Sequence, residues 1–432
     1  MFTQNRTFIL ILFFLSLFSR EIVSETLEEI VVLGDWRQVS ADQEDSSVVL
    51  LDAQTIKSQS MKHFEQLSYL VPNLNFAASD SRARYFQIRG IGERSGYQGT
   101  PNSSVGFLID DIDYSGQGGI ATTFDVEQIE IHRGPQGSRI GANALAGLIY
   151  IRTKEPTDMF EANSEITLGS YGIKSTGLAF GGPFKENENI SYRLAFRKDK
   201  EDGFRKNLYL KQSDTSRKDE STSRLKINWE PSEKTTIKLL VSRVDLNDPA
   251  DIWTLDGSLN TLSDRPGMDS QKTSSYGLKI FQDFEGFEIQ SLTSSTDTDV
   301  IFSYDADWGN EDSWSPFIYD YFSETLRDRR TFGQEFRLVS NAADLKRNKK
   351  IEWIFGVSYL EIKESNLKKD DGNYGDPSDP YGPYASSSSS LSKYKSENFS
   401  VFGNIDYLLS ETIKLSLGMR WEDWESEYSC PL

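Results

Sequence analysis

The sequence predicts a mainly β protein, in which a compact α/β domain precedes a transmembrane antiparallel β-barrel. From about residue 160 onward, apolar and polar residues alternate with a period of two, which is typical of strands with one apolar and one polar face. Short and long connections alternate between these strands, as in outer-membrane barrels, where turns lie at one rim and loops at the other. Aromatic residues reach 12% of the 432 residues, which also favours strands.

The first residues predict export. Arg6 supplies a positive charge, and residues 8–18 form an apolar run of 11 residues that is broken only by Ser16. That run is long enough for the core of a signal peptide and too short to span a bilayer as a helix. We expect a signal peptide over residues 1–24, ending at Ser24, with an uncleaved interfacial anchor as the alternative.

Charge and composition exclude several classes of function. The net charge of −19 argues against a basic surface that binds nucleic acid. Cys430 is the one cysteine, and His63 and His132 are the two histidines, so a zinc site built from His and Cys is excluded. No arrangement of nucleophile and histidine is supported, so no catalytic residue and no enzyme activity is predicted. Both histidines are expected to be structural.

Residues 40–157 are expected to form the α/β domain. Residues 55–70 have apolar side chains in helical spacing, with Pro72 just past the end, and predict one helix. Short strands are expected at residues 85–89, 105–109 and 128–133. Glycine is dense between them, which indicates tight turns and not a dinucleotide-binding sheet.

Residues 158–432 are expected to form the barrel wall. We predict eleven strands between residues 161 and 422. The strands of a soluble β-sandwich also alternate apolar and polar residues, but that fold does not require loops that are long at one end only. Short connections are expected at residues 182–189, 230–234, 285–286, 341–349 and 408–411, and long ones at 200–219, 245–272, 298–329 and 363–393. The last long connection contains the serine run 386–390, which is typical of a solvated loop.

A short β-branched run follows the expected cleavage site. Residues 28–34 read Glu-Glu-Ile-Val-Val-Leu-Gly and have no neighbouring strand in sequence. A β-prone segment of this kind can be donated to the sheet edge of another protein. The alternative is that it forms the first strand of the following domain.

Several motifs resemble the plug domain of TonB-dependent receptors. They are residues 86–92, 105–111, 126–137 with the stretch Arg-Gly-Pro-Gln-Gly, and 141–149. Residues 29–32 resemble the TonB box. The resemblance covers the chain in order and implies a signal peptide at 1–24, the TonB box and linker at 25–39, the plug at 40–157 and part of the barrel at 158–432.

The resemblance also implies location, partners and activity. It implies a plug inside a barrel of about 22 strands in the bacterial outer membrane, monomeric at full length, and contact with outer-membrane lipid. It implies energised uptake of a scarce nutrient, such as an iron–siderophore complex, driven by the protein TonB. No cofactor is expected to be bound by the protein itself, although the ligand is a metal chelate in many members. The residues implied for TonB binding are Glu28, Glu29, Ile30, Val31 and Val32.

The sequence departs from the family pattern in two ways. About eleven strands are half of such a wall, and the chain ends at residues 429–432 without a terminal aromatic strand. From this we expect a truncated receptor whose 432-residue product does not transport. Two competing classes stay open, namely a passive porin-like channel, which needs neither plug motifs nor a TonB box, and a β-rich adhesion module.

Three residues are candidates for holding the plug to the barrel. Arg89 and Arg133 each end a plug strand just before a glycine, and the resemblance implies that they bind carboxylates of the barrel wall. Glu335 is the candidate partner, because Phe332 and Phe336 share one face of their strand and so Glu335 points to the lumen. The alternative is that the arginines only satisfy carbonyl groups of the plug.

Residues 93–103 and 114–123 are expected to form apices of the plug, where a ligand would bind. Arg94 is the candidate for an anionic ligand, and Tyr97 and Tyr114 for stacking or hydrogen bonding. The competing roles for these side chains are loop solubility and packing between plug and wall.

An acidic cluster follows the second plug strand. Asp110, Asp111 and Asp113 lack the spacing of a calcium loop. We therefore expect them to form hydrogen bonds in the barrel lumen, and we predict no metal site.

Overall fold

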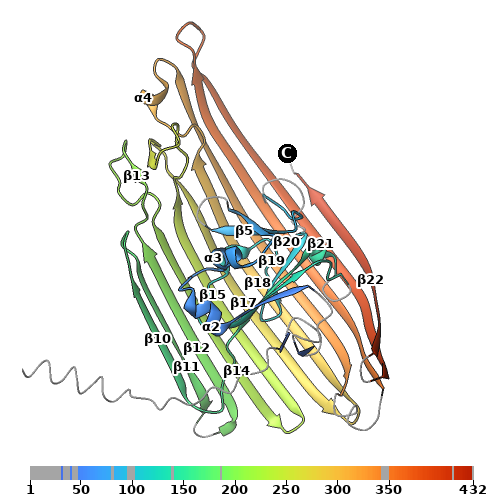
Figure 1. The fold of residues 1–432 in the computed structure, drawn as a ribbon. Coiled ribbons are helices and arrows are strands. Elements are labelled where there is room, and N and C mark those ends of the chain that lie inside the picture. The colour runs from blue at the N-terminus through green and yellow to red at the C-terminus, as the bar shows by residue number, and fades with distance from the viewer. Residues whose placement is uncertain are drawn as a thin grey trace, which may run out of the picture.

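The computed structural model consists of a broad β-sheet with a smaller α/β plug against one of its faces (Figure 1). It describes residues 31–32, 39–40, 47–78, 82–94, 103–137, 141–184, 187–341, 350–410 and 413–430. Among the described residues, no helix is both long and apolar enough to cross a bilayer.

The wall is an 11-stranded sheet in which every strand is antiparallel to its neighbour in sequence order. The prediction of eleven strands is confirmed. Among the described strands, β10 and β22 form the two edges of this sheet. The strands are β10 (Glu161–Leu168), β11 (Lys174–Phe184), β12 (Asn187–Glu201), β14 (Lys218–Ser232), β15 (Thr235–Ala250), β17 (Gly267–Phe284), β18 (Phe287–Asp305), β19 (Ile318–Ser340), β20 (Ile351–Gly375), β21 (Tyr384–Ser410) and β22 (Ile413–Ser429).

Tight turns join the strands at one rim. Between β17 and β18 only Glu285 and Gly286 remain, and Gly286 has a φ of +91°, which a side chain would disfavour. The flanking Phe284 and Phe287 pair across the ladder, and their rings stack with centroids 5.2 Å apart. Residues 233–234 alone separate β14 from β15, within the short connection predicted at residues 230–234. The other expected short connections contain residues outside the described ranges.

The two faces of the wall differ as the alternation predicts. Phe332, Phe336 and Leu338 on β19 are 40–50% exposed and lie on the outer face. Glu335 and Arg337 occupy the intervening positions and line a cavity on the plug side. Outward apolar and inward polar positions are the pattern that a wall between lipid and a wet interior requires.

The long connections are shorter than predicted, because the strands continue beyond the apolar band. The serine run 386–390 lies within β21 and not in a loop, and its side chains are exposed. Only residues 376–383 separate β20 from β21, and this hairpin projects past the other strands at the top of Figure 1. The alternation rule detects a strand only where one face meets lipid, whereas ladder hydrogen bonds also hold a strand that is polar on both faces.

The plug is built on a five-stranded sheet in the order β3-β8-β9-β6-β7. Its core contains Phe64, Phe86 and Phe107, with ring centroids 5.1 Å apart for the first pair and 5.5 Å for the last. The same core includes Leu240 and Val244 of the wall. The elements are β3 (Val48–Asp52), α2 (Ala53–Ser58), α3 (Phe64–Leu67), β4 (Leu74–Ala78), β5 (Ala83–Ile88), β6 (Val105–Ile109), β7 (Ile112–Asp113), β8 (Val126–Arg133) and β9 (Gly147–Thr153).

The single helix predicted over residues 55–70 is wrong. The helix α2 ends at Ser58, Ser60 has a φ of +51°, and a second short helix starts after His63. His63 caps that second helix, since its Nδ1 accepts a hydrogen bond of 3.2 Å from the backbone N–H of Glu65. The apolar spacing continues across the break, so periodicity alone does not reveal the cap.

Part of the segment expected to be the TonB box forms a separate sheet from the plug sheet. Strand β1 (Val31–Val32) pairs with β2 (Val39–Ser40) in a two-stranded antiparallel sheet. The remaining predicted box residues, Glu28, Glu29 and Ile30, and the expected signal peptide lie outside the described residues.

Candidate functional site

The centre of the interface between plug and wall is the turn between β6 and β7. Asp110 and Asp111 form this turn with φ values of +53° and +70°, a conformation that aspartate tolerates better than most residues. Asp110 Oδ1 accepts a hydrogen bond of 3.0 Å from Nζ of Lys226 on β14. Asp111 forms an ion pair with Lys279 on β17. One turn of the plug thus binds two strands of the wall.

Lys226 is a buried hub of this network. Its Nζ also donates to Thr153 O at 2.9 Å and to Glu155 Oε1 at 2.6 Å, so all three ammonium hydrogens are used. Lys238 donates to the other oxygen of Glu155 at 3.0 Å. Burial alone would raise the pKa of Glu155, but Lys226 and Lys238 hold that pKa well below its usual range. The pKa of Asp111 is lowered for the same reason. Burial alone would raise this pKa, but the charge of Lys279 has the larger effect and lowers it.

A second set of ion pairs holds the plug near its apex. Arg82 binds both oxygens of Glu220 on β14 at 2.6 and 2.8 Å, and it donates to Glu65 at 2.5 Å. Burial alone would raise the pKa of Glu65, but the charges of His63 and Arg82 lower it to about 2. Arg84 forms an ion pair with Asp269 on β17. Bidentate, buried pairs of this kind fix the orientation of the plug.

The third contact lies at β11 and β12. Arg193 donates two hydrogen bonds to Asp125 of the plug, at 2.9 and 2.5 Å. The neighbouring Phe124 packs with Ala179 and Ala195 of the wall, and the Arg197 guanidinium lies 5.4 Å from its ring centroid. Charged and apolar contacts therefore fix the same edge of the plug.

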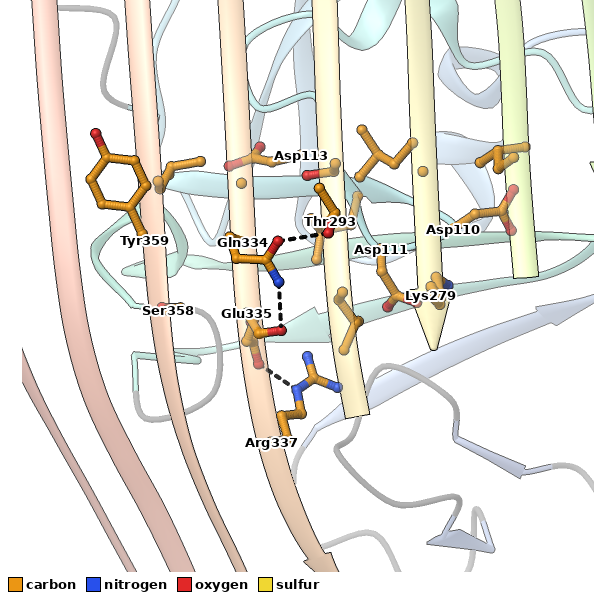
Figure 2. Close-up of a pocket in the computed structure, with 18 of the residues that line it drawn as sticks. Asp110, Asp111, Asp113, Lys279, Thr293, Gln334, Glu335, Arg337, Ser358 and Tyr359 are labelled. Atoms are coloured by element: carbon orange, nitrogen blue, oxygen red, sulfur yellow. Dashed lines mark hydrogen bonds and ion pairs between the residues drawn. The ribbon is translucent and has the colours of Figure 1, made fainter. Parts of the chain in front are cut away.

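A cavity of about 160 Å³ adjoins this interface. Figure 2 shows Asp110, Asp111 and Lys279 on one side of the cavity and Glu335, Arg337 and Tyr359 on the other. A cavity of this size is large enough for several water molecules, and its lining is rich in charged groups. The arrangement is suited to ion pairs that break and form again, because water in the cavity can solvate the separated charges.

The structure places the predicted plug–wall residues differently from our expectation. Glu335 forms its ion pair with Arg337, two positions along the same face of β19, and not with Arg89 or Arg133. Arg133 donates to Ser47 Oγ at 3.0 Å within the plug, and Arg89 lies beside Gly134. Glu335 points to the plug side of the wall, as predicted. Its ion-pair partner, however, is Arg337 on its own strand and not an arginine of the plug. The role of Arg89 and Arg133 in holding the plug to the barrel stays a prediction.

The predicted ligand residues also have distinct positions. Arg94 is exposed, as a ligand contact requires, and its role stays a prediction. Tyr97 lies outside the described residues. Tyr114 is 3% exposed and belongs to the plug core, with its hydroxyl near Ser275 of β17. In this conformation Tyr114 packs between plug and wall and does not contact a ligand, because a buried side chain cannot reach an external molecule.

The acidic cluster and the histidines are placed as predicted. Asp110 and Asp111 form lumenal hydrogen bonds, and Asp113 accepts from the backbone N–H of Ser115 at 2.7 Å. His63 is buried, with Nε2 3.0 Å from Gly119 O, and burial lowers its pKa to about 4. His132 is fully buried and contacts Glu130 at 2.9 Å.

Sequence reasoning missed the wall residues that hold the plug. Two of them, Glu220 and Asp269, are acidic. The others share one signal, which is a basic side chain at an inward position of a strand whose outward positions are apolar. That signal predicts the face but not the partner. The residues are Arg193, Lys226, Lys238 and Lys279.

The plug matches a known family. Residues 40–148 match the model described as TonB-dependent Receptor Plug Domain. The same residues form the plug sheet, and the wall strands follow them directly. Residues 40–148 are therefore a plug domain of the TonB-dependent receptor family. Plug domains of this family occur in proteins of the bacterial outer membrane, and the wall of antiparallel strands after the plug fits that location.

Curated relatives share limited identity with this chain. It is 24% identical to the ferric enterobactin receptor PirA of Pseudomonas aeruginosa over 194 residues, which are 41% of this chain and 26% of PirA. It is 29% identical to the vitamin B12 transporter BtuB of Vibrio vulnificus over 97 residues, which are 22% of this chain and 16% of BtuB. The matches therefore cover less than a third of each relative.

Solved structures share the fold of this chain. The ferric yersiniabactin uptake receptor FyuA of Yersinia pestis superposes with a TM-score of 0.69 at 16% identity, covering 90% of this chain and 61% of FyuA. The ferripyoverdine receptor of Pseudomonas aeruginosa superposes with a TM-score of 0.64 at 13% identity, covering 93% of this chain and 55% of that protein. The chain thus spans a little more than half the length of these receptors.

Proposed function

We propose that the plug and wall of this chain, within a complete barrel, serve the energised uptake of an iron–siderophore complex across the outer membrane. The observation that carries the proposal is a plug that is held to its wall by ion pairs beside a cavity lined by charged groups. Relatives and structural neighbours named for ferric enterobactin, ferric yersiniabactin and ferripyoverdine support the ligand class. The protein itself holds no cofactor in this proposal, and the metal enters as part of the ligand.

The plug residues supply the mechanical part of this function. TonB pairs as a strand with residues 28–32, and its pull reaches the plug through the linker. The pull loads the pairs of Asp110 with Lys226 and of Asp111 with Lys279, which lie at the turn between β6 and β7. Water in the adjoining cavity solvates the separating charges, which lowers the cost of breaking buried pairs.

A reversible cross-link between plug and wall tests the proposal. Asp111→Cys with Lys279→Cys, in a Cys430→Ser background, places two thiols where an ion pair now joins plug and wall. In a receptor with a complete barrel, we expect a cleavable bifunctional thiol reagent to abolish uptake of ferric enterobactin without abolishing its binding, and cleavage to restore uptake.

The matched control joins two wall strands. Lys198 and Asp219 form an ion pair between β12 and β14, so Lys198→Cys with Asp219→Cys cross-links the wall alone. Uptake should survive this cross-link. Equal uptake by both cross-linked proteins would refute a moving plug.

A passive channel is the competing function. It would conduct without TonB, so Val31→Pro, which removes a backbone N–H from the box strand, would leave uptake unchanged. We expect this variant to bind ligand and fail to take it up, while Val31→Ile behaves like the parent.

A further inference from the structure

A row of tyrosines crosses the strands that project beyond the rest of the wall. Tyr319 on β19 pairs with Tyr374 on β20, and Tyr374 pairs with Tyr384 on β21. Residues that pair directly in an antiparallel ladder point to the same face, with their side chains in contact distance. These three residues, which we call the tyrosine row, therefore lie side by side near the tip of the hairpin at the top of Figure 1.

The tyrosine row faces the plug side of the wall. Tyr319 and Arg327 are separated by an even number of positions, and Arg327 Nη1 lies 3.4 Å from the hydroxyl of Tyr85 in the plug. The ladder between β19 and β20 keeps one register from Ile318 to Val339, so the side chains of Tyr319 and Arg327 share a face. Aromatic girdles of an outer-membrane wall face the lipid, so a girdle does not explain this row.

Two further rings extend the row. Trp314 of α4 (Glu311–Trp314) packs edge-on against Tyr319 with ring centroids 5.0 Å apart, and the Tyr321 centroid lies 4.9 Å from that of Tyr319. Tyr321 pairs with Gly372, where a Cβ would collide with the Tyr321 ring. The absence of a side chain at Gly372 thus lets this ring lie against the backbone of β20.

The tyrosine row is accessible, although it lies on the inward face. Tyr319 is 37% exposed, Tyr374 is 41% exposed and Tyr384 is 50% exposed. Tyr394, on the same face of β21 but farther from the tip, is 7% exposed. A single exposed tyrosine needs no explanation, but neighbouring exposed rings on one face indicate a surface that binds a partner with flat groups.

Positive charge lies between the tyrosine row and the plug. Arg327 and Arg329 both face Glu364, since Arg327 Nε lies 3.3 Å and Arg329 Nη1 lies 4.0 Å from its oxygens. Two guanidinium groups thus meet one carboxylate. A Cβ at Gly116, in the plug, would lie 3.5 Å from Arg329 Nη1, so these cations reach the apex of the plug. Their potential attracts an anionic ligand toward the plug without direct contact.

We propose that the tyrosine row binds an iron chelate whose metal-binding groups are aryl rings, namely catecholates or phenolates. This inference rests on the proposed uptake of an iron–siderophore complex and names the class of chelate. Rings of the ligand stack on the row in the offset or edge-to-face geometry that aromatic pairs prefer. Catecholates and phenolates lose protons when they bind Fe³⁺, and their negative charge is attracted by Arg327 and Arg329. A hydroxamate or citrate chelate has no ring to stack on the row.

Binding of two ferric chelates to the full chain tests the proposal. The probes are ferric enterobactin, which has aryl rings, and ferric citrate, which is anionic and has none. Tyr374→Ala combined with Tyr384→Ala should weaken the binding of ferric enterobactin about tenfold, on the order expected when two stacked rings are lost. Tyr374→Phe combined with Tyr384→Phe keeps both rings and should bind like the parent.

Tyr381→Ala is the matched control. Tyr381 lies in the turn of the same hairpin and is 85% exposed, but it does not belong to the tyrosine row. Its loss should leave the binding of ferric enterobactin unchanged. The proposal is overturned if Tyr381→Ala and the double alanine variant lose affinity equally, or if neither loses any. It is also overturned if ferric citrate depends on the row as strongly as ferric enterobactin does.

A second measurement needs no substitution. Ferric enterobactin should protect Tyr374 and Tyr384 of the unaltered chain from nitration by tetranitromethane, as measured by mass spectrometry of peptides. Tyr381 should be nitrated equally with and without the chelate, and ferric citrate should protect none of the three. Unchanged nitration of Tyr374 and Tyr384 overturns the proposal, even if the alanine variants misfold.

The class of chelate and the transport function can fail separately, because neither measurement requires TonB or a moving plug. Protection of the tyrosine row, together with uptake that survives the cross-link between positions 111 and 279, would refute the moving plug and support the aryl class. Uptake of a hydroxamate chelate that this cross-link blocks, without protection of the row, would support transport and refute the aryl class.

Discussion

Single buried residues determine how the plug is held and how it responds to pH. His63 joins two parts of the plug, since Nδ1 caps α3 and Nε2 contacts Gly119 O. Both contacts use the neutral imidazole, and burial makes the charged form unfavourable. A histidine that caps a helix is therefore also a point at which acid weakens the plug.

Acid should destabilise the plug through His63. Its pKa falls from 6.5 to about 4 on folding, so the unfolded chain binds a proton in this interval that the folded chain does not. The free energy of unfolding should therefore decrease as pH falls, by about 2 kcal/mol between pH 7 and pH 5. Glu65 does not contribute in this interval, because its pKa is lowered from 4.5 to about 2, and its stabilisation is lost only below that interval.

Hydrogen exchange of the β8 and β9 amides at pH 7 and pH 5, corrected for intrinsic rates, measures this effect. His63→Asn keeps an N-cap oxygen and removes the titrating group, so its stability should change less with pH. A variant as sensitive to pH as the parent would assign the effect to another group.

Among the elements, close approach between plug and wall depends on small residues. Gly177 lies on the inner face of β11, and a Cβ at this position would lie 2.4 Å from the Phe124 ring. Ala179 and Ala195 line the same contact. The small residues of the wall thus form a shallow apolar surface on which Phe124 packs, beside the Arg193–Asp125 pair.

Gly177→Ala should loosen the plug. Phe124 is 7% exposed and has little room to move, so the added methyl group should cost about 1–3 kcal/mol. Protease resistance of the plug in the membrane-inserted receptor measures the loss. Gly137→Ala is the matched control, because a Cβ at Gly137 would have no neighbour within 4 Å. Equal resistance of the two variants would contradict the close contact.

Across the molecule as a whole, the plug is fixed by charge at three sites. Pairs from β12, β14 and β17 bind its edge, its central turn and its apex. Each ion pair is strong while it is buried and weak once water reaches it, because water screens the attraction between the two charges. The proposed transport therefore requires water to reach these pairs before the plug can move.

Removal of the central hub should release the plug as a unit. Lys226→Met keeps the length of the side chain but leaves Asp110 buried without its cation, at a cost of about 3–5 kcal/mol. The denaturant concentration at which the plug becomes protease-sensitive should fall. Lys369→Met is the control, because its pair with Glu324 is exposed and about half of the lysine side chain is accessible. If both variants shifted equally, the hub would have no special role.

The secondary structure of the wall and the identity of the plug can be predicted from the order of the residues. Alternation predicts eleven strands and the inward face of Glu335, because a strand in lipid must separate apolar from polar side chains. It does not predict the true length of β20 and β21, since strands outside the lipid need no apolar face.

Which charges meet depends on the packing of the folded chain. Asp110 and Lys226 are 116 positions apart, and the sequence offers many inward lysines and arginines for each carboxylate. The choice follows from how the plug sits against the wall, and that is set by packing such as Phe124 against Gly177.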